Sequence, residues 1–148
     1  MLIQTIASSL RQDLLKLRKE IELYENEKNI WKVQGNISNS AGNLCLHLVG
    51  NLNTYIGQQI GKTGYLRNRD QEFSLKNIPR QELLNKIDET INVVDSSLAK
   101  LSEADLEKEY PLLVYDKMTS TEYMLVHLST HLGYHLGQVN YHRRLIDG

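Results

Sequence analysis

The sequence is poor in residues that interrupt or cross-link a chain. It contains two prolines, Pro79 and Pro111, and one cysteine, Cys45, among 148 residues. Because proline breaks helix interiors, its scarcity leaves long uninterrupted windows in which helices can form. A single cysteine cannot form an internal disulfide, so we expect a reducing, cytoplasmic location.

Charge of one sign and long apolar runs are also lacking. The chain has 17 Lys+Arg against 18 Asp+Glu, and 41% of its residues are hydrophobic. Nucleic-acid-binding domains are usually basic, so we expect no nucleic-acid partner. The N-terminal segment has no basic start followed by a long apolar run, so we expect no signal peptide and no membrane partner. The length predicts one domain, over residues 1–148, with its own core.

Apolar residues recur at helical spacing in four windows. Near the N-terminus they alternate at spacings of three and four, as in an amphipathic helix: Ile3, Ala7, Leu10, Leu14, Leu17, Ile21 and Tyr24. Further helices are predicted over roughly 40–60, 79–101 and 120–146. Ser38 or Ser40 can cap the second helix, and Thr119 with Glu122 fits a capping box for the last one.

The connections between these windows determine the predicted architecture. Residues 61–79 form a long link between the second and third helices, and residues 102–120 are irregular, with 112–115 briefly extended. A link as long as 61–79 can span the length of the helices, so the helices that it joins need not be antiparallel neighbours. Four long helices without convincing strands predict an all-α four-helix bundle, built either with one crossover or as an up-down meander.

Four of the five histidines lie within residues 127–142. At about 100° per residue, His127, His131, His135 and His142 share the apolar face of the last helix, and Gln138 joins them. Buried imidazoles need a partner for each nitrogen, and a metal ion provides one because neutral imidazole is a common ligand. Residues four apart can bind one ion together, so His127 with His131 and His131 with His135 both qualify. His142 lies about 10 Å further along the axis.

A third ligand has to come from another helix, and His47 is the remaining histidine. It shares a face of the second helix with Asn43, Asn51, Thr54, Tyr55 and Gln58. So polar a face is suited to the wall of a water-filled pocket, and Asn51, Tyr55 and Gln58 are candidates for binding a substrate. Cys45 projects about 200° away and is more typical of a buried structural thiol.

A purely structural role for the histidines is the alternative. A histidine on an apolar face is usually a core residue with hydrogen-bonded nitrogens, and this interpretation applies to His142 and to His127. Other kinds of metal site fit less well. The last helix lacks the Glu-x-x-His pairs of di-iron proteins, and the His-Glu-x-x-His motif of metalloproteases is absent. We find no acidic residue on the histidine-bearing faces of the second and last helices.

The segment "HLGYHLGQ", with "NLCLHLVGNL" on an earlier helix, resembles the DinB/YfiT-like family of metal-binding four-helix bundles. The resemblance implies that His47, His131 and His135 are the metal ligands and that Gln138 completes the motif. It covers essentially the whole chain. Leu136 departs from the family pattern, since many members carry Arg at this position, but by helical spacing it points away from the histidines.

The same resemblance implies a function. Family members with assigned activities resemble thiol-dependent S-transferases or isomerases that use low-molecular-weight thiols, and many form dimers. Three neutral histidines leave an open coordination position, which is typical of catalytic zinc sites. We therefore expect a metal-dependent hydrolase or thiol S-transferase that acts on a small molecule, contains Zn, Ni, Fe or Mn, and forms a homodimer.

Residues around the ligands would then bind the substrate or orient the histidines: Gln138, Tyr55, Asn51, Gln58 and His127. A second hypothesis is a non-catalytic helical bundle that binds a metal or a small ligand. A third is a structural or interaction bundle whose histidines are satisfied in the core.

Overall fold

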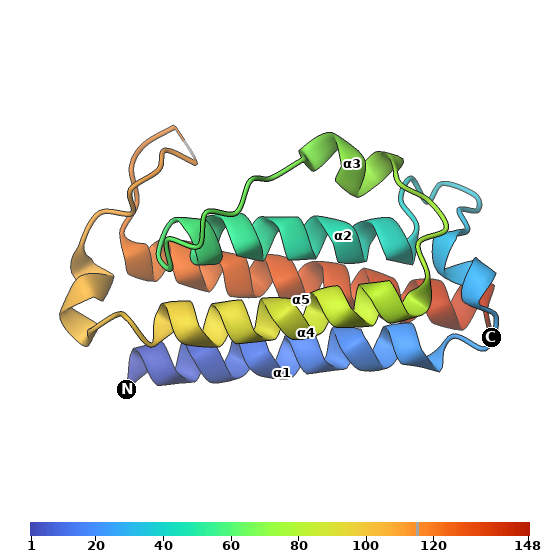
Figure 1. Cartoon of the computed structure of the whole chain (residues 1–148), viewed down its shortest axis with the longest axis horizontal. Helices are drawn as coiled ribbons and strands as arrows, with labels where there is room; N and C mark the ends of the chain where they lie inside the picture. Colours follow the sequence, from blue (N-terminus) through green and yellow to red (C-terminus); the bar gives the residue numbers. More distant parts are fainter. Residues whose placement is uncertain (115) are drawn as a thin grey trace.

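The computed structural model describes residues 1–114 and 116–148, and these residues form an all-α structure. Four long helices lie side by side: α1 (Leu2–Leu23), α2 (Ala41–Leu52), α4 (Arg80–Leu98) and α5 (Thr121–Ile146) (Figure 1). The short helix α3 (Arg69–Ser74) lies outside α2, and two 3₁₀ segments cover Glu27–Trp31 and Glu103–Glu107. The prediction of an all-α fold is confirmed.

Two features differ locally from the expected elements. The second helix continues beyond α2 as a π-helical segment, Asn53–Gln58, so its predicted range of roughly 40–60 holds but its winding changes. Residues 112–114 form no strand, and Tyr115, the last residue of the extended segment expected there, lies outside the described residues. Within those residues, no helix is both long and apolar enough to cross a membrane.

The link between α2 and α4 runs along the molecule. α2 packs against α4 and α5, and α1 packs against the same two helices. Figure 1 shows that α2 and α4 point in the same direction, so residues 59–79 must return over the length of α2 before α4 begins. The expectation that these two helices need not be antiparallel is confirmed.

The core follows the predicted apolar seams. α1 buries Ile6, Leu10, Leu14, Leu17 and Ile21, while Ile3 and Ala7 at its start are only partly buried. α4 buries its apolar positions from Leu83 to Leu98. Burying a Leu or Ile side chain fully contributes about 1.5–3 kcal/mol relative to leaving it exposed, so these seams favour the packed arrangement of the long helices.

The polar face of α2 is not the solvent-filled wall that the sequence suggests. Every residue of α2 is buried, because the link crosses its outer side. Asn43 donates hydrogen bonds from Nδ2 to the carbonyl oxygens of Glu72 and Leu75, both at 2.9 Å. Its Oδ1 accepts a hydrogen bond from Lys76 Nζ at 2.6 Å. Asn43 therefore holds the link against α2. The prediction that Asn43 lies on the wall of a water-filled pocket is wrong.

Serine side chains cap both site-bearing helices. Ser40, one of the two expected residues, accepts a hydrogen bond from the Asn43 backbone N–H at 3.1 Å. At α5 the cap is Ser120, whose Oγ accepts from the Tyr123 N–H at 3.0 Å. The predicted capping box at Thr119 is wrong by one residue, because the Thr119 carbonyl accepts from the Tyr110 N–H at 2.8 Å before the helix begins.

Replacement of this cap should destabilise the protein measurably. We expect Ser120→Ala to lower the free energy of unfolding by about 1 kcal/mol, because the Tyr123 N–H loses its acceptor. Thr119→Ala is the matched control and should change it by less than about 0.5 kcal/mol. Urea denaturation followed by circular dichroism measures both values. A larger loss for Thr119→Ala would contradict the assignment of the cap.

Candidate metal centre

Three histidines from two helices converge at one point between α2 and α5. His47 lies in the middle of α2, and His131 and His135 lie one turn apart on α5. One ring nitrogen from each lies within 4.8 Å of the other two, so the cluster could hold a metal ion. The Nε2 atoms of His47 and His131 are 3.3 Å apart. Two imidazole nitrogens bound to one tetrahedral zinc lie about 3.3–3.4 Å apart, so the spacing fits.

The His47 ring is held by an acidic residue from the link. His47 Nδ1 lies 3.1 Å from Glu72 Oε1, and a carboxylate can only accept, so Nδ1 carries the proton. The lone pair of His47 is therefore on Nε2, which points to the centre. Such a carboxylate–histidine pair commonly orients a metal ligand and increases its basicity.

Arg67 holds Glu72 in turn. Its Nε donates to Glu72 Oε2 at 2.7 Å, and its Nη2 donates to Glu72 Oε1 at 3.0 Å. Glu72 is only 5% exposed, and burial alone would raise its pKa. Hydrogen bonds and charge from His47 and Arg67 outweigh burial and lower the pKa of Glu72 below its ordinary value. Glu72 is therefore ionised at neutral pH.

A glycine on α2 makes room for this carboxylate. A Cβ atom at Gly50 would overlap Glu72 Oε2, because Gly50 lies one turn from His47 on the side that the link covers. The close approach of the α3 side chain to α2 therefore requires glycine at this position.

His135 is oriented by a residue of its own helix. Its Nδ1 lies 2.7 Å from Gln138 Oε1, which accepts a hydrogen bond and so places the proton on Nδ1. The Nε2 lone pair of His135 is left for the centre. Gln138 thus orients a candidate ligand, as expected for a residue next to the site.

Burial favours the neutral form of His131 and His135. Burial is the main cause that lowers the pKa of His131, and together with the neighbouring His135, His47, His127 and Arg67 it brings that pKa to about 4. Burial also lowers the pKa of His135, against the raising effect of its Gln138 hydrogen bond. The His131 Nδ1 atom is buried and has no hydrogen-bond partner within the described residues. Neutral imidazoles are the form in which histidine binds metal ions.

The other predicted site residues lie at different distances from this centre. The His127 ring stacks on that of His131, with 6.2 Å between centroids. Asn51 is 7% exposed, and its Oδ1 has no partner within the described residues. Tyr55 lies beneath the Arg67 guanidinium, 5.8 Å from the ring centroid. The Gln58 Oε1 atom accepts a hydrogen bond from the Gly64 N–H at 2.6 Å, so this side chain holds the start of the link.

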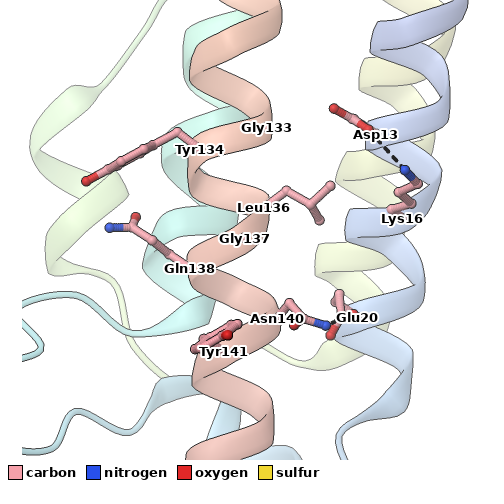
Figure 2. A pocket seen from close by; sticks show the side chains of 10 residues that line it. All are labelled: Asp13, Lys16, Glu20, Gly133, Tyr134, Leu136, Gly137, Gln138, Asn140 and Tyr141. Atoms are coloured by element: carbon pink, nitrogen blue, oxygen red, sulfur yellow. Dashed lines mark hydrogen bonds and ion pairs between the residues drawn. The ribbon is translucent and has the colours of Figure 1, made fainter.

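Leu136 lies on the far side of α5 from the histidines. It lines a groove of about 770 Å³ between α5 and α1, together with Asp13, Lys16 and Glu20. Figure 2 shows Leu136 pointing toward α1, whereas Tyr134 and Gln138 point to the opposite side of α5. None of the three clustered histidines lines this groove, so we expect a change at position 136 to leave the candidate ligands in place.

His142 belongs to a separate, structural interaction. It is 3% exposed, its Nδ1 lies 2.6 Å from the Tyr24 hydroxyl, and its Nε2 lies 2.7 Å from the Lys32 carbonyl oxygen. The carbonyl requires a proton on Nε2, so Nδ1 accepts from Tyr24. Both nitrogens are satisfied, and the ring fastens the end of α5 to the segment that follows α1. The structural interpretation of His142 is confirmed.

The structural role of His142 predicts a pH dependence of stability. Burial lowers the pKa of His142, against the raising effect of the Lys32 hydrogen bond, so the folded protein binds this proton less readily than the unfolded chain. The neutral His142 ring stabilises the folded protein fully at a pH above about 6.5, which is the pKa of histidine in an unfolded chain. This stabilisation is lost as the pH falls toward the lower pKa that His142 has in the folded protein. In EDTA, wild type should lose more unfolding free energy between pH 7.5 and 5.5 than His142→Gln. Equal losses in urea titrations would contradict this.

Sequence reasoning missed the residues that support His47. The segment "RNRDQEF", which holds Arg67 and Glu72, lies in the predicted link 61–79, and its spacing assigns neither residue a role in the site. One local signal was available: Asn68 caps α3 by accepting from the Gln71 N–H at 3.2 Å, and Asn is a favoured cap residue. Spacing along the chain could not show that this short helix lies against His47.

Comparison with models of known protein families places the chain in one family. The family model described as "Protein of unknown function (DUF1572)" matches residues 3–148. The chain therefore belongs to this family. A search of curated proteins found no match.

Proposed function

We propose that the protein is a metal-dependent enzyme, either a hydrolase or a low-molecular-weight-thiol S-transferase, with His47, His131 and His135 as the metal ligands. The observation that carries the proposal is the convergence of the three rings, whose ligand nitrogens lie within 4.8 Å of one another. The proton positions on His47 and His135, set by Glu72 and Gln138, leave both Nε2 atoms to face the centre.

The protein's own residues would position and insulate such a centre. Glu72 and Gln138 fix the ring orientations, and the Arg67–Glu72 ion pair closes the link side of the site. A bound divalent metal would lower the pKa of a coordinated water or thiol. Three protein ligands leave room for that fourth ligand. Zinc, nickel, iron and manganese are all compatible with an imidazole-rich donor set.

The wider proposal rests on the resemblance and the composition. We infer one DinB/YfiT-like four-helix-bundle domain over residues 1–148 and a small-molecule substrate. We also infer that the protein is a cytoplasmic homodimer that binds neither nucleic acid nor a membrane. The buried single cysteine and the near-neutral charge support these inferences. Burial raises the pKa of Cys45 to about 12, so this thiol is not a nucleophile of the proposed reaction.

Cobalt(II) substitution tests whether the centre is open. The visible spectrum of the cobalt protein should change when a small thiol is added, and chelation should abolish turnover of ester substrates or of a thiol with an electrophile. His135→Ala should show neither response. A tightly bound ion with an unresponsive spectrum and no turnover would instead support a non-catalytic metal-binding role.

A further inference from the structure

A second pocket is lined by one of the three clustered histidines. It has a volume of about 520 Å³ and is bordered by His135 and Gln138 on α5 and by Leu44 on α2. Pockets of about 300–1,000 Å³ are the usual size for small-molecule sites. A molecule in this pocket would lie beside one of the three proposed ligands and beside the amide that orients it.

Apolar side chains gather around this pocket although they are exposed. Ile37, Tyr134, Tyr141 and Leu145 are 37–71% exposed, and all four line it. Tyr134 also lies against the ring of His135, with 5.3 Å between centroids. Exposed apolar side chains that surround one concave site are typical of a ligand-binding surface. A ligand with an apolar part would remove these side chains from water.

The polar side chains of the pocket are uncharged. Asn36, Ser38 and Asn39 contribute one rim, and Gln138 contributes the other. The lining contains no Lys, Arg, Asp or Glu, and the His142 ring is tied to Tyr24 and Lys32. Two cations lie near the pocket but outside its lining: Arg67 is paired with Glu72, and the Arg144 guanidinium lies over the Tyr141 ring, 5.1 Å from its centroid. The neighbouring groove shares Tyr134, Gln138 and Tyr141 with this pocket, but its charged side chains, Asp13, Lys16 and Glu20, come from α1 (Figure 2).

We propose that this pocket binds an uncharged, partly apolar small molecule that directs one metal-binding polar group toward His135. The inference rests on the proposed function, since the polar group needs a metal at the three histidines. A carboxylate held against this lining would lose hydration, and no Lys or Arg of the lining could pair with it. The pocket therefore selects against substrates and thiols that carry carboxylates, and the amide side chains at its rims suit neutral hydrogen-bonding groups.

A matched pair of hydroxamates tests the charge selectivity. Hexanohydroxamic acid and its analogue with a terminal carboxylate share the metal-binding head and differ in the charge of the tail. Isothermal titration of the zinc-loaded protein should show at least about tenfold tighter binding of the neutral compound. Equal or tighter binding of the anionic compound, with zinc bound, would overturn the inference and leave the proposed function standing.

Two lysine variants test whether the preference for the neutral compound arises in this pocket. Asn36→Lys adds a cation at the rim, and we expect it to reduce the preference for the neutral compound by about twofold to fivefold. Gln34→Lys adds the same charge two residues earlier, outside the lining, and should leave the preference unchanged. An equal effect of the two variants would overturn the assignment to this pocket. Absence of zinc binding by wild type would overturn the proposed function as well, so the two failures are distinguishable.

Discussion

His131→Ala is expected to abolish specific metal binding, with a loss of affinity greater than about 100-fold. Loss of an outer residue that orients a ligand typically costs 10–100-fold, and His131 is itself the proposed central ligand. Its Nε2 faces that of His47, and its ring is 4.6 Å from that of His135. Removal of His131 would leave two nitrogens from separate helices. Competition with a chromogenic chelator measures the affinity.

The stability of the protein gives a second measure of the same change. A ligand that binds only the folded state at 100 times its dissociation constant stabilises it by about 2.7 kcal/mol. Zinc at that concentration should raise the melting temperature of the wild type and leave that of His131→Ala unchanged.

His127→Ala is the matched control for this experiment. His127 lies one turn earlier on α5 and stacks on His131, but it is not part of the cluster of ligand nitrogens. We expect its replacement to change metal affinity by only about threefold or less, because no ligand nitrogen is lost. If His127→Ala removed the metal and His135→Ala did not, the ligand pair on α5 would be His127 with His131.

Glu72→Gln is expected to weaken metal binding by about 10–100-fold while the fold is kept. The substitution keeps the shape of the side chain but removes the charge that makes His47 a stronger donor. It also leaves the Arg67 guanidinium, whose side chain is 14% exposed, without its counter-charge beside the metal. A cation near the centre repels a bound metal ion, so both effects weaken binding.

Glu20→Gln provides a control for the loss of a carboxylate that pairs with arginine. Glu20 Oε2 accepts from Arg143 Nε at 2.7 Å, the same distance as between Glu72 and Arg67, and its side chain is 13% exposed. This pair joins α1 to α5 about two turns beyond His135, away from the three clustered histidines. We expect Glu20→Gln to lower stability without a change in metal affinity. Equal metal affinities for the two variants would show that Glu72 has no effect on the centre.

The helices and the histidine cluster were predictable because both depend on local periodicity. The α1 seam from Leu10 to Ile21 follows from spacings of three and four, and one such step places His131 and His135 together. The pairing with His47 required a second helix. Spacing alone left two pairs open on α5, and the resemblance to a known motif selected one of them.

The parts that were not predictable depend on where the link lies. Nothing in the spacing of Arg67 and Glu72 indicates that they lie over α2, because their contacts with His47 join residues 20 and 25 positions apart through space. The same packing explains why the polar face of α2 is buried. The cap at Ser120 depended on a backbone hydrogen bond between Thr119 and Tyr110, which lies outside the helix pattern.

The metal content of the untagged protein tests the central claim most directly. The protein should be purified without a nickel column and analysed by mass spectrometry, alongside the His47→Ala, His131→Ala and His135→Ala variants. The account predicts about one divalent ion per chain in the wild type and its loss in all three variants. A wild-type protein that holds no metal, even after reconstitution with zinc, nickel, iron or manganese, would contradict it.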